Sequence, residues 1–207
     1  MKNWAFGAVI SALSICGGIA LPAAAGDLLT DSKSGCKVQS AFQAEGLEVQ
    51  WSGTCTNGMA AGKGTLTWIV KDQVAVKDIG TFEDGALEGS GMRENIFWKS
   101  TYKGSFHAGL FEGNGRLELT NGTVYDGEWK AGKQNGVGRF EFNNGNVYEG
   151  TVKNGLKIGH GKFTWSDTTY FEGEFVNDQP EGDGMCRDKN GKVAACTFAD
   201  GEFQAWK

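Results

Sequence analysis

The feature that most constrains the fold of this chain is a short pattern that recurs every 23 residues. Each regular copy contains an aromatic residue two positions before a glycine, and a pair of glycines follows nine and eleven positions after that glycine. The first glycines of the four regular copies are Gly104, Gly127, Gly150 and Gly173. A fixed period of this length is typical of stacked supersecondary units, each of which buries its apolar side against its neighbours. The sequence therefore predicts a repeat protein.

Alternation within a copy predicts β-strands. In residues 148–152 (Tyr-Glu-Gly-Thr-Val) the apolar residues and the glycine fall on one face, and the polar residues fall on the other. Residues 138–142 alternate in the same way, and Asn-Gly pairs such as Asn144-Gly145 separate the copies. A three-residue loop at 143–145, with glycine at positive φ, keeps the aromatic residues of both strands on one face. Each copy is therefore predicted to be a β-hairpin with an apolar face and a charged face.

The charged face is predicted to pair with itself. Strands of one kind carry acidic residues such as Glu149 and Glu172, and strands of the other kind carry basic residues such as Arg139 and Lys162. Neighbouring strands then place opposite charges side by side. We interpret this face as solvated and self-paired rather than as an acidic binding surface.

These residues resemble the MORN repeat (membrane occupation and recognition nexus), whose pattern is Tyr-x-Gly-x-Trp-x-x-Gly-x-x-x-Gly-x-Gly. The resemblance covers residues 51–203, with copies that start near positions 51, 78, 102, 125, 148 and 171 and a half copy near 194. It implies an all-β fold, an elongated, twisted antiparallel sheet of successive β-hairpins of about 23 residues with caps at both ends. Asp78 stands where the second copy should have an aromatic residue, and extra residues lie near 70–77 and 95–100.

The N-terminal residues have the anatomy of a signal peptide. A short basic start precedes an apolar stretch at 4–21, and an Ala-x-Ala site then predicts cleavage after Ala25. An uncleaved anchor fits less well because of the small-residue site, and a lipoprotein fits less well because Ile15 precedes Cys16. The predicted product is periplasmic or secreted. Residues 26–50 are predicted to be a lead-in segment that caps the first edge, and 204–207 a C-terminal tail.

The cysteines agree with export. Removal of residues 1–25 leaves four, namely Cys36, Cys55, Cys186 and Cys196. An even number in an exported chain predicts two disulfides, which allow three connectivities. We favour Cys36–Cys55 and Cys186–Cys196, because each bridge then closes one end of the array and because the three-residue loop places the second pair on one face. With two histidines in the chain and no Cys-x-x-Cys spacing, we expect no metal site.

Charge and motif content argue against several classes of function. The chain has 25 acidic and 20 basic residues and a net charge of −5, so it lacks the basic surface that nucleic acids require. His107 and His160 lie at turns with no nucleophile at a recognisable spacing, and the carboxylates recur with the repeat. We therefore expect no catalytic residues, no enzyme activity and no cofactor.

The apolar face carries the remaining prediction about function. One sheet cannot leave such a face entirely in water, so its aromatic ladder is either stacked as core or open as a groove for a peptide or a second copy. We favour a non-catalytic protein-interaction scaffold that binds through this face. The alternatives are a phospholipid-binding module, which the acidic charge disfavours, and a self-associating envelope structural protein. The candidate groove consists of Tyr102, Phe106, Tyr125, Trp129, Tyr148, Phe171 and Phe175.

Overall fold

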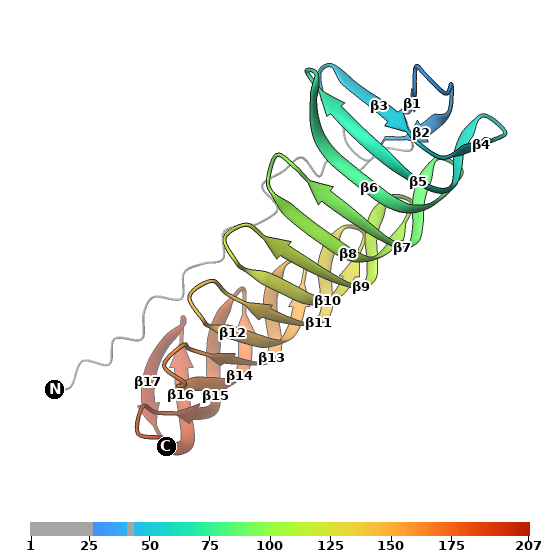
Figure 1. Cartoon of the computed structure of the whole chain (residues 1–207). Coiled ribbons are helices and arrows are strands. Elements are labelled where there is room, and N and C mark those ends of the chain that lie inside the picture. Colours follow the sequence, from blue (N-terminus) through green and yellow to red (C-terminus); the bar gives the residue numbers. More distant parts are fainter. Residues whose placement is uncertain (1–26, 41–43) are drawn as a thin grey trace. The chain divides into compact units, whose positions relative to one another are not determined.

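The computed structural model describes residues 27–40 and 44–207, so the predicted signal peptide lies outside the described residues. The described chain is all-β, with seventeen strands in twisted, mainly antiparallel sheet (Figure 1). Its contacts divide it into two compact units, which meet between Gly132 and Lys133 in the sequence. The predicted fold class of successive β-hairpins is confirmed.

The first unit ends at Gly132 and holds the N-terminal strands. From β5 onward each strand pairs antiparallel with the next along the chain. The first strands differ, because β3 and β4 both pair with the long strand β5, and β2 meets β5 in parallel at one residue pair. The strands are β1 (Leu28–Thr30), β2 (Lys37–Gln39), β3 (Leu47–Trp51), β4 (Thr54–Thr56), β5 (Met59–Val70), β6 (Gln73–Glu83), β7 (Ala86–Asn95), β8 (Ser100–His107), β9 (Leu110–Leu119) and β10 (Val124–Lys130).

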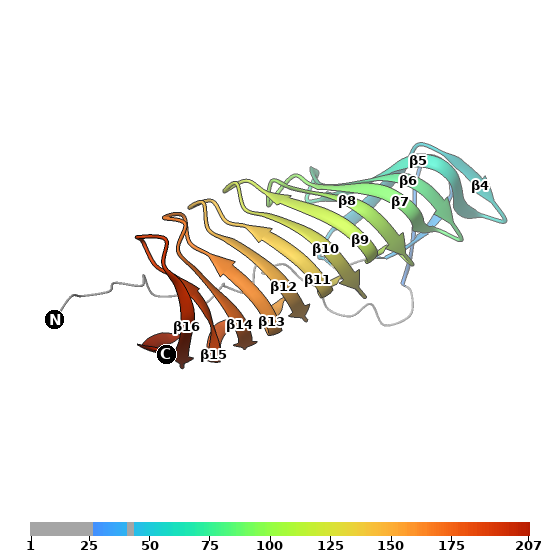
Figure 2. The ribbon, with the colours of Figure 1, turned by 90° about the horizontal axis from the view of Figure 1, so that it is seen from below.

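The second unit contains the C-terminal strands, which pair in chain order and are antiparallel throughout. Figure 2 shows β12 to β16 side by side and bent in the same sense. The strands are β11 (Lys133–Glu141), β12 (Val147–Lys153), β13 (Leu156–Thr164), β14 (Tyr170–Val176), β15 (Gln179–Arg187), β16 (Val193–Ala199) and β17 (Glu202–Trp206).

Two kinds of turn connect the strands. Within a copy the turn has two residues, such as Ala131-Gly132 and Asn154-Gly155, and both have positive φ, as a type I′ turn requires. Between copies the predicted three-residue loop at 143–145 is confirmed. The amide of Phe142 donates to the carbonyl of Asn146 at 2.9 Å, and Gly145 has a φ of 84°. The two turn types alternate, and this keeps the aromatic residues of the repeat pattern on one face.

The paired glycines of the repeat form a flat seat for the aromatic ring. Gly150 of β12 lies opposite Gly161 of β13, and the ring of Tyr148 covers both. A Cβ atom on either glycine would stand 2.5 Å from the phenol oxygen of Tyr148, which is closer than real contacts allow. That oxygen donates a hydrogen bond to the carbonyl of Thr151 at 2.9 Å. The spacing of aromatic residue and glycines in the repeat therefore has a steric cause.

A methyl group added at one of these paired glycines should destabilise the fold. We expect Gly161→Ala to lower the free energy of unfolding by about 1–3 kcal/mol, because the ring of Tyr148 must move out of its seat. His160→Ala is the matched control, since His160 is exposed on the same strand and its loss should change stability by less than about 0.5 kcal/mol. Urea unfolding followed by circular dichroism measures both, and equal midpoints for the two variants would contradict the steric account.

Candidate binding surface

The aromatic ladder that the sequence offered as a groove is buried. Its seven side chains have exposed fractions between 0% and 3%. The interpretation of these residues as an open groove is therefore corrected: they are the core of the two units. The reason is geometric, because rings such as those of Tyr102, Tyr148 and Phe171 lie on paired glycines and neighbouring rings pack edge to face. The seven residues are Tyr102, Phe106, Tyr125, Trp129, Tyr148, Phe171 and Phe175.

Packing in the first unit shows how tightly the ladder is held. The ring of Tyr102 stacks on that of Phe111 with centroids 3.7 Å apart, and the edge of Trp129 meets Tyr102 at 5.2 Å. The indole N–H of Trp129 donates to the carbonyl of Gly115 at 2.9 Å. Burial, with the nearby charge of Glu112, raises the pKa of Tyr102 to about 12. This phenol therefore stays protonated and serves as a structural donor to the carbonyl of Ser105 at 3.0 Å.

A second aromatic row on the same face remains partly open. In the second unit it comprises Phe142, which follows β11, and Trp165, which follows β13; both are half-buried. Phe163 connects them, with ring centroids 6.0 Å from Phe142 and 5.0 Å from Trp165. Both residues alternate in phase with the buried rings. The same alternation in the sequence could have identified this row, but the prediction considered the first strand of each copy.

The outer, charged face is self-paired, as the sequence predicted. Arg139 bonds to Glu149 on the neighbouring strand at 3.1 Å and to Glu141 at 2.8 Å. Lys162 lies 3.2 Å from Glu172. These groups are solvent-exposed, so each pair contributes little stability, but together they offset the charge on this face. The outer face is therefore a poor site for a charged ligand.

Comparison with known proteins decides the family. The family model of the MORN repeat matches residues 52–72, 102–124, 125–147, 148–170 and 171–193. The chain belongs to the MORN repeat family. No curated protein matches it. Among solved structures it is similar to a SAS-4 (dCPAP) TCP domain in complex with a Proline Rich Motif of Ana2 (dSTIL) of Drosophila melanogaster. The identity is 16%, the match covers 66% of this chain and 79% of that chain, and the TM-score is 0.37.

The family model passes over residues 73–101, where the structure nevertheless has a MORN-type hairpin, β6–β7. Asp78 replaces the aromatic residue of this copy and is buried against Arg93, with the Arg93 Nε donating to Asp78 Oδ1 at 2.6 Å. Trp68 also donates to Asp78, at 2.8 Å. Leu87 fills the space over the paired glycines in place of the missing ring. An ion pair thus replaces one aromatic residue of the ladder. Asp78 was recognisable in the sequence as a departure from the repeat, but its partner Arg93 was not.

A second buried ion pair lies in the MORN copies of the second unit. Lys157 Nζ donates to Asp178 Oδ1 at 2.9 Å, and the two side chains are 4% and 6% exposed. The ammonium group also lies between 5.5 and 5.7 Å from the ring centroids of Phe140, Phe142 and Tyr148. Asp178 takes the second turn position, where the other copies have glycine, and it has a φ of 74°. Sequence reasoning missed this pair, although the absent turn glycine was visible.

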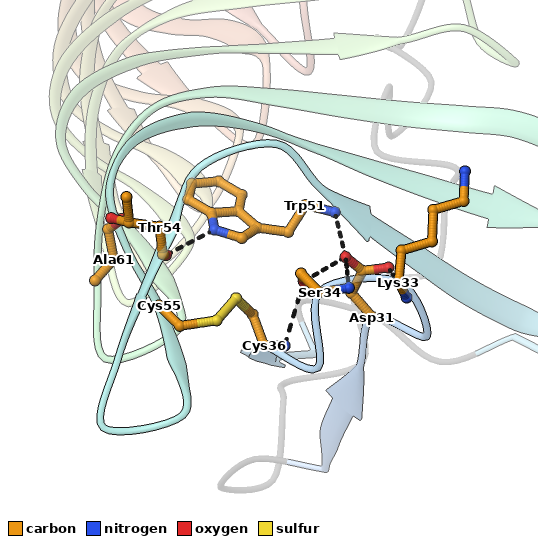
Figure 3. Close-up of a disulfide and its surroundings, with 8 residues drawn as sticks. All are labelled: Asp31, Lys33, Ser34, Cys36, Trp51, Thr54, Cys55 and Ala61. Atoms are coloured by element: carbon orange, nitrogen blue, oxygen red, sulfur yellow. Dashed lines mark hydrogen bonds between the residues drawn. A yellow bond between two sulfur atoms is a disulfide. The ribbon is translucent and has the colours of Figure 1, made fainter.

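The disulfides join the cysteines in the pairs that we favoured. The Cα atoms are 5.6 Å apart in Cys36–Cys55 and 5.8 Å apart in Cys186–Cys196. The second bridge is diagonal, because Gly184 rather than Cys186 lies opposite Cys196. The first bridge links the segment before β2 to β4, as Figure 3 shows. Both bridges are compatible with an oxidising compartment.

Asp31 anchors the N-terminal segment beside the first bridge (Figure 3). Its carboxylate accepts hydrogen bonds from the hydroxyl and amide of Ser34 and from the amides of Lys33 and Trp51. Burial alone would raise the pKa of Asp31, but these hydrogen bonds outweigh it and hold the pKa below its ordinary value. The ionised form therefore stabilises the fold.

The free energy of unfolding is expected to depend on pH through Asp31. Because the pKa of Asp31 is lower in the folded chain, its contribution is complete above about pH 4 and is lost as the pH falls through the folded pKa. We expect Asp31→Asn to lower the free energy of unfolding by about 1–3 kcal/mol at neutral pH. The gap between variant and wild type should narrow in acid. Urea midpoints at neutral and acidic pH measure this, and a gap that widens on acidification would contradict it.

The two histidines, which are the remaining candidates for catalysis or metal binding, lie on different strands. His107 is exposed at the end of β8, where its Nδ1 is 3.2 Å from Glu88 Oε2, and His160 is exposed on β13. Across residues 27–40 and 44–207, no three or more His, Cys, Asp or Glu side chains converge as a metal site. In the same described ranges no helix is long and apolar enough to cross a membrane.

Proposed function

We propose that this chain is a non-catalytic scaffold that is exported. It binds a partner protein through the second aromatic row, which lies on the apolar, inner face of the sheet. MORN repeats are generally interaction motifs for proteins or membranes. The observation that carries the proposal is the division of one face into two rows. The ladder beside the glycine seats is fully buried, whereas Phe142 and Trp165 keep exposed aromatic surface.

Aromatic side chains that are partly exposed on a rigid scaffold are suited to protein recognition, because they bury a large area at a low entropic cost. Phe142 is fixed by the loop hydrogen bond from its amide and by stacking on Phe140 at 5.8 Å. Trp165 is fixed in the same way, since its amide donates to the carbonyl of Thr169 at 2.9 Å. A partner with an apolar segment fits this row better than it fits the self-paired outer face.

Support for a non-catalytic role comes from the ionisable groups. The buried phenols of Tyr102 and Tyr125 have raised pKa values and act as structural donors. Among the buried carboxylates, Asp78 and Asp178 are each held by a basic partner, and Asp31 is held by hydrogen bonds from the chain around it. Groups that perform acid–base catalysis need a pKa near the working pH and access to a substrate. The proposal of a scaffold rests on this pattern together with the family.

Export is tested by measuring the intact mass of the protein. We expect the protein recovered from an exporting host to begin at Gly26 and to lack four hydrogens relative to its reduced mass, one pair for each disulfide. Reduction should restore these four hydrogens. A mass that includes residues 1–25, or four free thiols in the unreduced protein, would contradict the proposed compartment.

The binding row is tested by photo-crosslinking in cells. We expect a benzoylphenylalanine residue at position 142 to yield one discrete adduct. The same residue at position 149, on the outer face of the neighbouring strand, is the matched control and should yield none. Adducts of the same mass and yield from both positions, or from neither, would count against the second row as the interface.

A further inference from the structure

The turn between β7 and β8 presents three consecutive apolar side chains to solvent. Ile96, Phe97 and Trp98, here called the apolar tip, are 44%, 73% and 56% exposed. The rings of Phe97 and Trp98 touch edge to face, with centroids 5.1 Å apart. Exposed apolar residues are normally scattered singly over a protein surface. Three in a row at one turn therefore require a reason.

The repeat architecture does not supply that reason. The corresponding turns of the later copies are polar, with Thr-Asn-Gly-Thr at 120–123 and Asn-Asn-Gly-Asn at 143–146. The copy that carries the apolar tip also contains an extra residue, since its spacing to the next copy is 24 rather than 23 residues. Turns of this repeat fold with polar residues, so the apolar tip is dispensable for the hairpin itself.

The apolar tip is held rigidly by neighbouring backbone and polar groups. The amide of Trp98 donates to Asn95 Oδ1 at 2.8 Å, and the amide of Ile96 donates to the carbonyl of Ala75 at 2.8 Å. On the other side, the hydroxyl of Thr120 donates to the carbonyl of Lys99 at 2.6 Å. None of these bonds involves the three apolar side chains, which are thus free to contact another body.

We propose that the apolar tip inserts into the interfacial layer of a zwitterionic lipid bilayer. Phenylalanine and tryptophan side chains favour the membrane–water interface. A tip at the end of a hairpin can enter a fluid layer without a complementary pocket. Lys71 and Asp72 in the neighbouring β5–β6 turn offset each other, and Lys99 follows the tip, so these adjoining turn residues carry a net charge of only +1. With a net charge of −5, the chain gains no attraction from anionic lipid, so insertion is driven by apolar burial.

The test is co-sedimentation with phosphatidylcholine vesicles, using the chain recovered from an exporting host. We expect wild type to bind equally at about 0.1 M and about 0.5 M salt, because apolar insertion is not screened. Phe97→Ser with Trp98→Ser should reduce the partition coefficient by more than about tenfold. Val137→Ser, which removes a 63% exposed valine elsewhere, should leave it unchanged. All variants share one N-terminus, so differences between them report the substituted side chains.

A second variant identifies the inserting residue. Trp98→Phe keeps an apolar ring, so it should bind like wild type but lose the quenching of tryptophan fluorescence by brominated acyl chains. Failure of wild type to sediment at any vesicle concentration would overturn the proposal and leave a protein pocket as the occupant of the apolar tip. Equal binding by the double serine variant, or binding that salt abolishes, would overturn it as well. None of these outcomes depends on Phe142 or Trp165, so the proposed scaffold role stands or falls separately.

Discussion

Replacement of Trp129 by alanine is expected to lower the free energy of unfolding by about 3–5 kcal/mol. The side chain is 2% exposed, and its ring meets those of Tyr102, Phe111 and Tyr125 at centroid distances of 5.1 to 5.2 Å. The variant also loses the hydrogen bond from the indole to Gly115. The ring of Tyr102 is seated on Gly104 and Gly115 and cannot readily move into the space, so a cavity remains. Urea unfolding followed by far-ultraviolet circular dichroism measures the loss.

Val137→Ala is the control for this experiment, because Val137 is 63% exposed and its truncation should change stability by less than about 0.5 kcal/mol. If the ladder were instead an open site, Trp129→Ala would leave the unfolding midpoint near that of wild type. That result would favour the open groove, one of the two arrangements that the sequence allowed.

Asp178→Gly should be comparably damaging, although it restores the residue that the other copies have at this turn. The glycine relieves the positive φ of 74°, but it leaves the ammonium group of Lys157 buried without its partner. We expect a loss of about 3–5 kcal/mol, as is typical when one member of a buried ion pair is removed. A gain in stability would show that turn strain outweighs the ion pair.

The double variant Lys157→Leu with Asp178→Gly provides the matched control. It reproduces the arrangement at Leu87, whose carbonyl accepts a hydrogen bond from Gly109 in the turn of the next copy, as the carbonyl of Lys157 accepts one from Asp178. We expect it to recover most of the loss, because an apolar side chain needs no partner. The difference between the double variant and the sum of the single variants gives the coupling energy between the two residues.

Most of the fold was predictable because the repeat is physically redundant. Four copies with the same spacing of Tyr or Phe, paired glycines and turn residues each specify the same hairpin, and the register Gly150 to Gly161 follows from that spacing. Charge complementarity between strands was also readable from alternation, as the pair of Arg139 with Glu149 shows. Local signals and tertiary packing agree wherever the copies are regular.

The departures from the repeat were less predictable, because each depends on a contact between copies. Asp78 was recognisable as an anomaly, but its partner Arg93 stands fifteen residues later and replaces a residue that is apolar in other copies. The distinction between core and surface aromatics also escaped the sequence, since Tyr148 and Phe142 share one face. Tyr148 lies on the paired glycines, whereas Phe142 follows the end of β11, and alternation alone does not report this difference.

The division of the inner face into a buried ladder and a binding row is tested most directly by the adduct yield at position 142 in a Trp165→Ala background. Loss of the Trp165 side chain should reduce the yield by more than about tenfold, as expected for truncation of an aromatic anchor worth about 1.4 kcal/mol or more. Trp165→Phe should retain most of it, and both variants should remain folded because Trp165 is only half-buried. An unchanged yield with Trp165→Ala would contradict the assignment of this row as the partner interface.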